Sequence, residues 1–174
     1  KNAEIVTDTI ASFTPEGILL NSGMTLTADI IVTATGLNLQ LFGGMKLIVD
    51  DEVVDTSKTH AYKGVMLSGV PNFAVALGYT NASWTLKCDL NCLFVVKVLN
   101  HMKAHNYTIC TPEFDHENLK SEPLLDFDAG YVLRANHILP KQGSKAPWKV
   151  HQNYLKDLSS LKYGSVSDEY LVYK

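Results

Sequence analysis

Two pairs of metal-binding residue types stand four positions apart within one apolar stretch of the chain. Cys88 and Cys92 form the first pair, and His101 and His105 form the second. Residues four apart share one face of a helix, so each pair is spaced to hold a metal ion or, for the thiols, to act as a redox pair. A zinc site needs about four nitrogen or sulfur ligands, and neither pair has further ligands at a suitable spacing. We therefore expect buried thiols in the first pair and solvated cations near a helix end in the second.

Sequence patterns that bind phosphate or attack a carbonyl are absent. The chain contains no G-x-G-x-x-G, P-loop, H-E-x-x-H or G-x-S-x-G pattern. Asp126 and Asp128 are a candidate carboxylate pair, but two aspartates in a polar loop are usually solvated. No catalytic residue and no metal ligand follows from spacing, because catalytic groups assemble in space rather than along the sequence.

Two apolar runs end where a ligand could approach the backbone. Residues 28–36 form a largely apolar run that ends in Thr35-Gly36, as in a strand buried on both faces of a parallel sheet. Residues 73–78 form a second such run, and residues 79–84 lead from it into a helix. In open α/β sheets ligands bind just outside such strand ends. A helix start also offers free N–H groups to an anion or a carbonyl.

Trp84 stands at the second of these strand ends. Its indole could stack on a planar ring or form the wall of a pocket. It could equally fill the core between the sheet and the helix. The residues alone leave these two alternatives open.

The elements that must position these residues have the pattern of a mixed α/β fold. Alternating β-branched residues and turn residues predict a three-stranded meander over residues 4–27. The apolar spacing over residues 85–105 predicts a helix. Further expected elements are a hairpin around residues 50–52, short strands at 64–67 and 170–173, helices at 131–136 and 150–161, and loops at 111–128 and 140–148.

The composition is that of a folded protein. Of the 174 residues 46% are hydrophobic and 19% are charged, and the formal net charge is −3. These values exclude disordered, collagen-like and disulfide-scaffold chains, and the small charge argues against nucleic acid as a partner. No apolar run is long enough for a transmembrane segment. Since the chain begins Lys-Asn-Ala-Glu without an initiator Met or a signal segment, we expect a cytoplasmic part of a longer protein.

Several strings of the sequence, in their order and spacing, resemble one enzyme family. Residues 28–37 (ADIIVTATGL) resemble the Ala-Thr-Gly motif of flavoproteins with two dinucleotide-binding domains. Together with residues 69–87 (GVPNFAVALGYTNASWTLK) they resemble the C-terminal part of class B flavoprotein monooxygenases, the group of Baeyer–Villiger and flavin-containing monooxygenases. Residues 39–44, 66–73 and 139–148 resemble its ethionamide-activating Baeyer–Villiger subgroup.

This resemblance implies a fold, a domain division and a reaction. Residues 1–110 would be the C-terminal part of the FAD- and NADPH-binding region, with a small β meander, mixed sheet strands and flanking helices. Residues 111–174 would be a C-terminal extension. Full enzymes of this kind use FAD, NADPH and O₂ to insert one oxygen atom into a ketone or onto a sulfur or nitrogen atom of a small-molecule substrate.

The resemblance also implies site residues. Thr35 and Gly36 would lie near bound cofactor. Thr85 and Leu86 would present backbone N–H groups to the pyrimidine ring of FAD. Ser83 and Trp84 would line the substrate pocket.

Two further positions depart from the family pattern or match it weakly. Many Baeyer–Villiger enzymes have Gly-Pro where Gly78-Tyr79 stands here, which leaves the preference for ketones open. The segment 140–148 is a candidate counterpart of a loop that folds over NADP and often carries a Trp.

The family's phosphate-binding G-x-G-x-x-G, its NADPH domain and its flavin-side arginine have no counterpart in this sequence. We therefore expect the chain alone to be inactive and to bind no cofactor, and to self-associate through exposed strand edges. The alternative is a non-catalytic ligand- or protein-binding module that retains the flavoprotein sheet.

Overall fold

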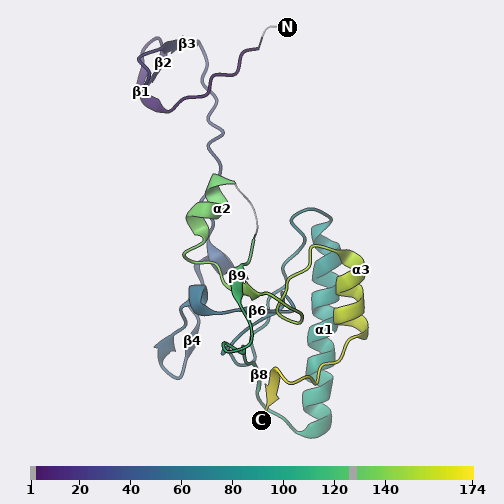
Figure 1. The fold of residues 1–174 in the computed structure, drawn as a ribbon. Helices are drawn as coiled ribbons and strands as arrows, with labels where there is room; N and C mark the ends of the chain where they lie inside the picture. The colour runs from purple at the N-terminus through teal and green to yellow at the C-terminus, as the bar shows by residue number, and fades with distance from the viewer. Residues whose placement is uncertain (1–2, 126–128) are drawn as a thin grey trace. The chain divides into compact units, whose positions relative to one another are not determined.

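The computed structural model describes residues 3–125 and 129–174, and the chain forms two compact units, Lys1–Leu37 and Asn38–Lys174 (Figure 1). Asp126 and Asp128 lie outside the described residues. The elements are, in order, β1 (Ile10–Thr14), β2 (Gly17–Leu20), β3 (Thr25–Thr27), η1 (Leu41–Gly44), β4 (Ile48–Val49), β5 (Glu52–Val53), η2 (Thr56–Lys58), β6 (Ala61–Tyr62), β7 (Met66–Leu67), α1 (Trp84–His105), β8 (Cys110–Pro112), β9 (Ser121–Pro123), α2 (Gly130–Ala135), β10 (Lys141–Gly143), α3 (Tyr154–Asp157), η3 (Leu158–Tyr163) and β11 (Leu171–Tyr173). The predicted mixed α/β class is confirmed.

The first unit is the predicted meander. Strands β1, β2 and β3 form one antiparallel sheet in that order. The turn between β1 and β2 closes on the pair Thr14 and Gly17. A Cβ atom at Gly17 would lie 2.0 Å from the carbonyl oxygen of Leu26, so only glycine fits this close approach of the neighbouring strand. Strand β1 starts at Ile10, later than predicted, because its partner β2 ends at Leu20 and offers no ladder beyond that point.

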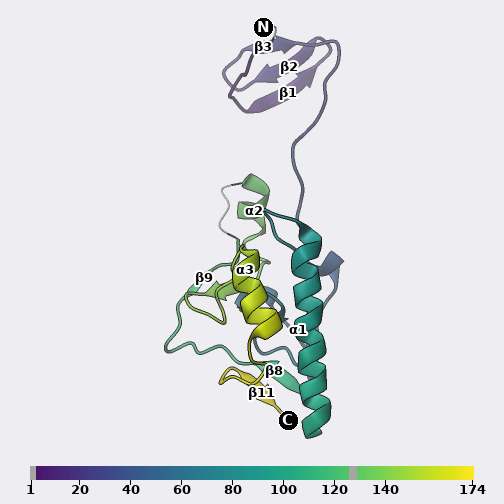
Figure 2. The same cartoon turned by 90° about the vertical axis from the view of Figure 1, so that its right-hand side faces the viewer.

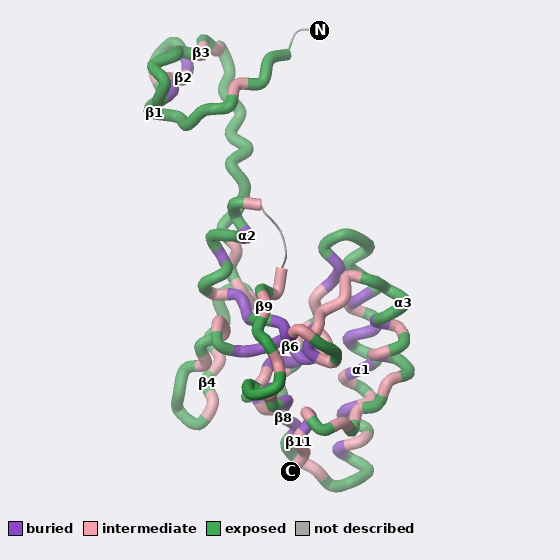
Figure 3. Tube along the Cα trace, in the orientation of Figure 1, coloured by how far each residue is buried: buried purple, intermediate pink, exposed green. Residues whose placement is uncertain are grey.

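The buried strand predicted over residues 28–36 is wrong. These residues form no strand, and the segment that follows β3 is coloured as exposed (Figure 3). Ile30 and Val32 are 81% and 83% exposed. A strand buried on both faces needs hydrogen-bonding neighbours on either side. Within residues 3–125 and 129–174 no segment forms a strand ladder with this run, although the Ala28 N–H donates to the Glu16 carbonyl oxygen at 3.1 Å. The apolar sequence therefore lacks the sheet that would bury it.

The second unit contains short antiparallel pairs around one core. The pairs are β4–β5, β6–β7, β8–β11 and β9–β10. The predicted hairpin around residues 50–52 is confirmed, and its turn residues Asp50 and Asp51 have the positive φ values of 51° and 66°, which suit a tight hairpin turn. The buried strand predicted over 73–78 is wrong, because this segment makes a single bridge, from Ala74 to Met66. Residues 73–77 alternate between half-buried and exposed, and only Gly78 of this segment is buried.

The long helix α1 forms one side of this core. Leu90, Phe94, Val98 and Met102 are buried at intervals of four residues, as the apolar spacing predicts for a helix that packs on one face. Helix α3 and the π-helix η3 pack along α1 in both views (Figure 1 and Figure 2). The helix predicted over 150–161 thus starts later, at Tyr154, and ends at Tyr163.

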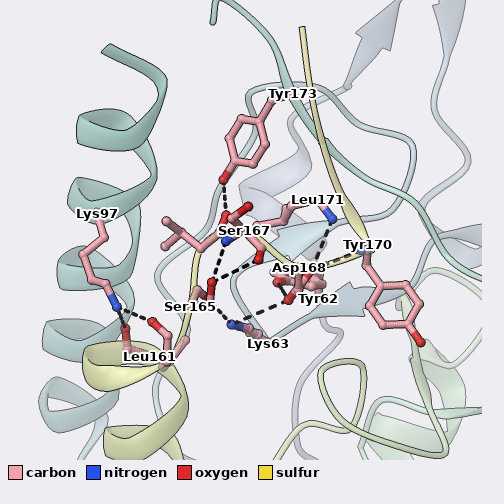
Figure 4. Close-up of polar contacts among 12 residues, drawn as sticks. Tyr62, Lys63, Lys97, Leu161, Ser165, Ser167, Asp168, Tyr170, Leu171 and Tyr173 are labelled. Atoms are coloured by element: carbon pink, nitrogen blue, oxygen red, sulfur yellow. Dashed lines mark hydrogen bonds and ion pairs between the residues drawn. The ribbon is translucent and has the colours of Figure 1, made fainter. Parts of the chain in front are cut away.

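Side-chain hydrogen bonds hold the C-terminal segment to the core (Figure 4). The Lys97 ammonium donates to the carbonyl oxygens of Lys162 and Gly164 at 2.9 and 2.6 Å, and so satisfies carbonyls at the end of η3. The Tyr62 hydroxyl donates to Asp168 Oδ2 at 2.5 Å. Burial, and then this carboxylate, raise the pKa of Tyr62, so the phenol stays a donor.

The predicted division of the chain into residues 1–110 and residues 111–174 stays a prediction.

Candidate functional site

The start of α1 presents an open helix end. Ser83 is the N-cap residue, but its side chain makes no capping hydrogen bond. Its hydroxyl instead lies 3.0 Å from the Thr85 hydroxyl. Trp84, Thr85 and Leu86 are all exposed. Because the first N–H groups of a helix have no intrahelical acceptor, this turn can donate hydrogen bonds to a carbonyl or an anion.

A large apolar cavity lies beside this helix start. It has a volume of about 830 Å³, and Trp84 forms part of its wall. Most of its other lining side chains are aliphatic or aromatic, among them Leu39, Leu41, Phe42, Val65, Met66, Leu77, Tyr79, Leu125, Tyr131, Val132 and Val150. The indole of Trp84 is 53% exposed. Of the two alternatives for this residue, the structure therefore favours a pocket wall over a core filling.

Gly78 makes the position of Trp84 possible. A Cβ atom at Gly78 would lie 2.3 Å from the indole ring and 2.6 Å from the Trp84 Cα. Any side chain at this position would displace the tryptophan or the helix start. The glycine is therefore required by close packing, which explains why it precedes the aromatic loop.

A buried ion pair lies beside the cavity, whose lining includes Lys87. Lys87 is 2% exposed, and its ammonium lies 2.9 Å from Asp157 Oδ2 and 3.3 Å from the carbonyl oxygen of His151. The ammonium also lies 5.1 Å from the ring centre of Tyr79, within the range of a cation–π contact. Burial, and then the Asp157 carboxylate, raise the pKa of Tyr79. These contacts hold α1, α3 and the loop of Tyr79 together.

Sequence reasoning missed this ion pair. The signal was present, because Lys87 stands on the same helical face as Leu90, Asn91 and Phe94, all of which are buried. A lysine on an apolar face predicts a buried partner. Its partner Asp157 follows 70 residues later, and no local pattern connects the two.

The predicted site residues fall into two groups. Ser83, Trp84, Thr85 and Leu86 are neighbours at the start of α1 in the second unit, where Trp84 lines the cavity. Thr35 and Gly36 belong to the exposed segment of the first unit, where Gly36 has a φ of 85°. These assignments to cofactor and substrate stay predictions.

The thiol prediction is partly wrong. Cys88 is half-buried and Cys92 is exposed, because the apolar face of α1 that packs on the core is the one carrying Leu90 and Phe94. Cys110 is buried, and burial raises the pKa of its thiol.

Among residues 3–125 and 129–174, no group of three or more His, Cys, Asp or Glu side chains is arranged to hold a metal ion. In the same residues, no helix is both long enough and apolar enough to cross a membrane.

Comparison with known proteins identifies relatives over almost the whole chain. FAD-containing monooxygenase EthA of Mycobacterium tuberculosis is 52% identical over 166 residues, which is 95% of this chain and 34% of the relative. EthA of Mycolicibacterium smegmatis is 52% identical over 97% of this chain and 34% of its own length. The "Probable FAD-binding monooxygenase AlmA" of Acinetobacter baylyi is 46% identical over 95% of this chain and 34% of its own length.

These relatives confirm the predicted resemblance to flavoprotein monooxygenases. The chain spans about a third of the length of the curated relatives that it matches. No family model matches the chain. No solved structure matches it either.

Proposed function

We propose that this homologue of a segment of FAD-containing monooxygenases contributes to the active site of a full-length flavin monooxygenase. Its contributions are one wall of the substrate pocket and one hydrogen-bonding contact to the flavin. A single observation supports this most strongly: the uncapped first turn of α1 opens beside an apolar cavity of about 830 Å³. A flavin has a polar pyrimidine edge and needs an apolar, water-poor reaction chamber, and this arrangement offers both.

The residues at the helix start fit the pyrimidine edge of FAD. The backbone N–H groups of Thr85 and Leu86 are donors in the first turn, and both residues are exposed. A carbonyl oxygen with partial negative charge is the group that such a helix end favours. Thr35 and Gly36 are proposed to lie on the cofactor side as well, through their Ala-Thr-Gly motif.

The cavity wall fits an apolar substrate. Trp84 lines the cavity and Ser83 directly precedes it in the chain, and the buried pair of Lys87 and Asp157 holds the wall in place. When bound, FAD reduced by NADPH supplies the chemistry that transfers one oxygen atom from O₂ to the substrate. This segment positions the substrate and excludes water; it contributes no general acid, base or nucleophile. The acceptor atom is a ketone carbonyl carbon, as in Baeyer–Villiger oxidation, or a sulfur or nitrogen atom.

The experiment compares two exposed apolar residues of α1 in the full-length protein that carries this segment. Trp84→Ala enlarges the pocket and should change the ratio of kcat/KM between a small and a bulky substrate by about tenfold or more. Leu99→Ala is the matched control, because Leu99 is 57% exposed on the same helix and does not line the cavity. Flavin content and far-UV circular dichroism verify that both variants fold.

A Trp84→Ala variant with the same ratio of kcat/KM between the two substrates as the Leu99→Ala control would show that Trp84 does not line the substrate pocket.

A second measurement tests the isolated chain. The isolated chain should be colourless, because it lacks the pattern that binds the phosphates of FAD. A flavin absorbance spectrum from the purified chain would contradict this expectation.

A further inference from the structure

The last two turns of α1 carry the histidine pair that the proposed function does not use. His101 is half-buried and His105 is exposed. Their ring centroids lie 4.3 Å apart, with an interplanar angle of 39°. With metal–nitrogen bonds of about 2.0–2.1 Å, two imidazoles bound to one ion have centroids about 4.5–5.2 Å apart. The free rings therefore stand about 0.2–0.9 Å closer together than two imidazoles bound to one ion would.

The tautomer of His105 is set for metal binding. Its Nδ1 atom lies 2.9 Å from the carbonyl oxygen of His101. A carbonyl oxygen only accepts hydrogen bonds, so Nδ1 carries a proton, and in the neutral ring Nε2 carries the lone pair. Metal-bound histidines in proteins are usually oriented in this way, with the second ring nitrogen donating to a carbonyl or a carboxylate.

The surroundings also hold the rings and favour a cation. The His105 ring stacks on Tyr107 at 5.6 Å and 12°, and the His101 ring lies 4.8 Å from Tyr173. The helix ends at His105, where its dipole is negative. Lys103 is the nearby basic residue of this turn, and it projects from almost the opposite side of the helix, since it lies about 200° around the axis from either histidine.

We propose that His101 and His105 form a two-histidine chelate for a late first-row divalent metal ion such as Zn²⁺, Ni²⁺ or Cu²⁺, with water completing the coordination. Imidazole nitrogen is a preferred ligand of these ions. The site has two protein ligands, so it binds and exchanges an ion rather than enclosing a structural one. It lies at the opposite end of α1 from the proposed flavin contact and does not depend on it.

The test titrates the purified chain with ZnCl₂ or NiCl₂ alone and follows binding by calorimetry. We expect one ion per chain and a higher melting temperature with metal. His101→Gln and His105→Gln should each weaken binding at least about tenfold, because each removes half of the chelate. His137→Gln is the matched control: His137 is exposed and its Nδ1 also contacts a carbonyl oxygen, that of Arg134, but Leu133 occupies the position four residues before it.

Equal affinity in the double variant His101→Gln/His105→Gln would overturn the proposal. So would the absence of binding to the folded wild-type chain at about millimolar metal. Long-range ¹⁵N NMR gives an independent reading. His105 should show the Nδ1–H tautomer, with an Nε2 resonance that moves on adding Zn²⁺; an Nε2–H tautomer would contradict the proposal.

Discussion

The two tryptophans of the chain, Trp84 at the cavity and Trp148 in the core, lie in different surroundings. Each packs against a glycine, since an added Cβ would lie 2.3 Å from the Trp84 ring at Gly78 and 2.6 Å from the Trp148 Cβ at Gly143. Trp148 is nevertheless fully buried, whereas Trp84 is 53% exposed. Trp148 has edge-on contacts with three rings, those of Tyr62, Phe114 and Tyr170. A glycine makes room for an indole, but neighbours from other segments decide whether it becomes core.

This contrast bears on the 140–148 segment. The segment was a candidate counterpart of a loop that folds over NADP. In the structure it contains strand β10, which pairs with β9, and it ends in the most deeply buried tryptophan. Trp148 therefore stabilises the fold, while Trp84 is free to contact a ligand.

The largest expected effect is the loss of stability on removing the core tryptophan. Trp148→Ala should lower the free energy of unfolding by about 3–5 kcal/mol, because it leaves a large cavity among three aromatic rings. Chemical denaturation of the isolated chain measures this change. Trp84→Ala is the control and should cost less than about 1 kcal/mol, since half of its surface stays in water. Equal losses in the two variants would refute the contrast.

The second-largest effect tests how much the buried ion pair beside the cavity contributes to the free energy of unfolding. Lys87→Met removes the cation and leaves Asp157 buried without its ion pair, which should cost about 3 kcal/mol. The double variant Lys87→Met/Asp157→Leu should recover part of this loss, because no charge remains unpaired. Urea unfolding of the single and double variants measures both quantities. A double variant no more stable than Lys87→Met would show that the ion pair is not the cause.

The smallest expected effect is a pH dependence of the free energy of unfolding, caused by a buried histidine that contacts the core. His60 is 2% exposed and stacks on Phe114, and its Nε2 lies 2.7 Å from the Ser121 hydroxyl. Burial, and then the charges of His116 and Lys141, lower the pKa of His60 from 6.5 to about 4. Because the folded-state pKa lies below the unfolded one, this histidine's contribution to stability is present above pH 6.5 and is lost as the pH falls toward 4.

The difference between wild type and His60→Gln isolates this contribution, since the other titrating groups are common to both. The wild-type chain should lose more stability than His60→Gln between pH 7 and pH 5. Melting temperatures at the two pH values measure the difference. A parallel decline in both proteins would exclude His60 as the titrating group.

Local patterns predicted much of the fold. Helix α1, the meander β1–β3 and the hairpin β4–β5 depend on apolar spacing and on turn residues close in the sequence. The predictions of buried strands over 28–36 and 73–78 were wrong. Apolar residues make a segment suitable for a buried strand, but they do not supply the neighbouring strands that a sheet requires. The described residues provide no such neighbouring strands for either run.

The sequence by itself determined the flavoprotein relationship, the helix that carries Trp84 and the candidate residues 83–86. Only the tertiary structure decided that Trp84 lines a cavity while Trp148 fills the core, and that Lys87 meets Asp157. It also brought the Tyr173 ring to the His101 ring. The physical reason is that turn and helix preferences act over a few residues, whereas burial, ion pairing and ring packing depend on segments that meet only after folding.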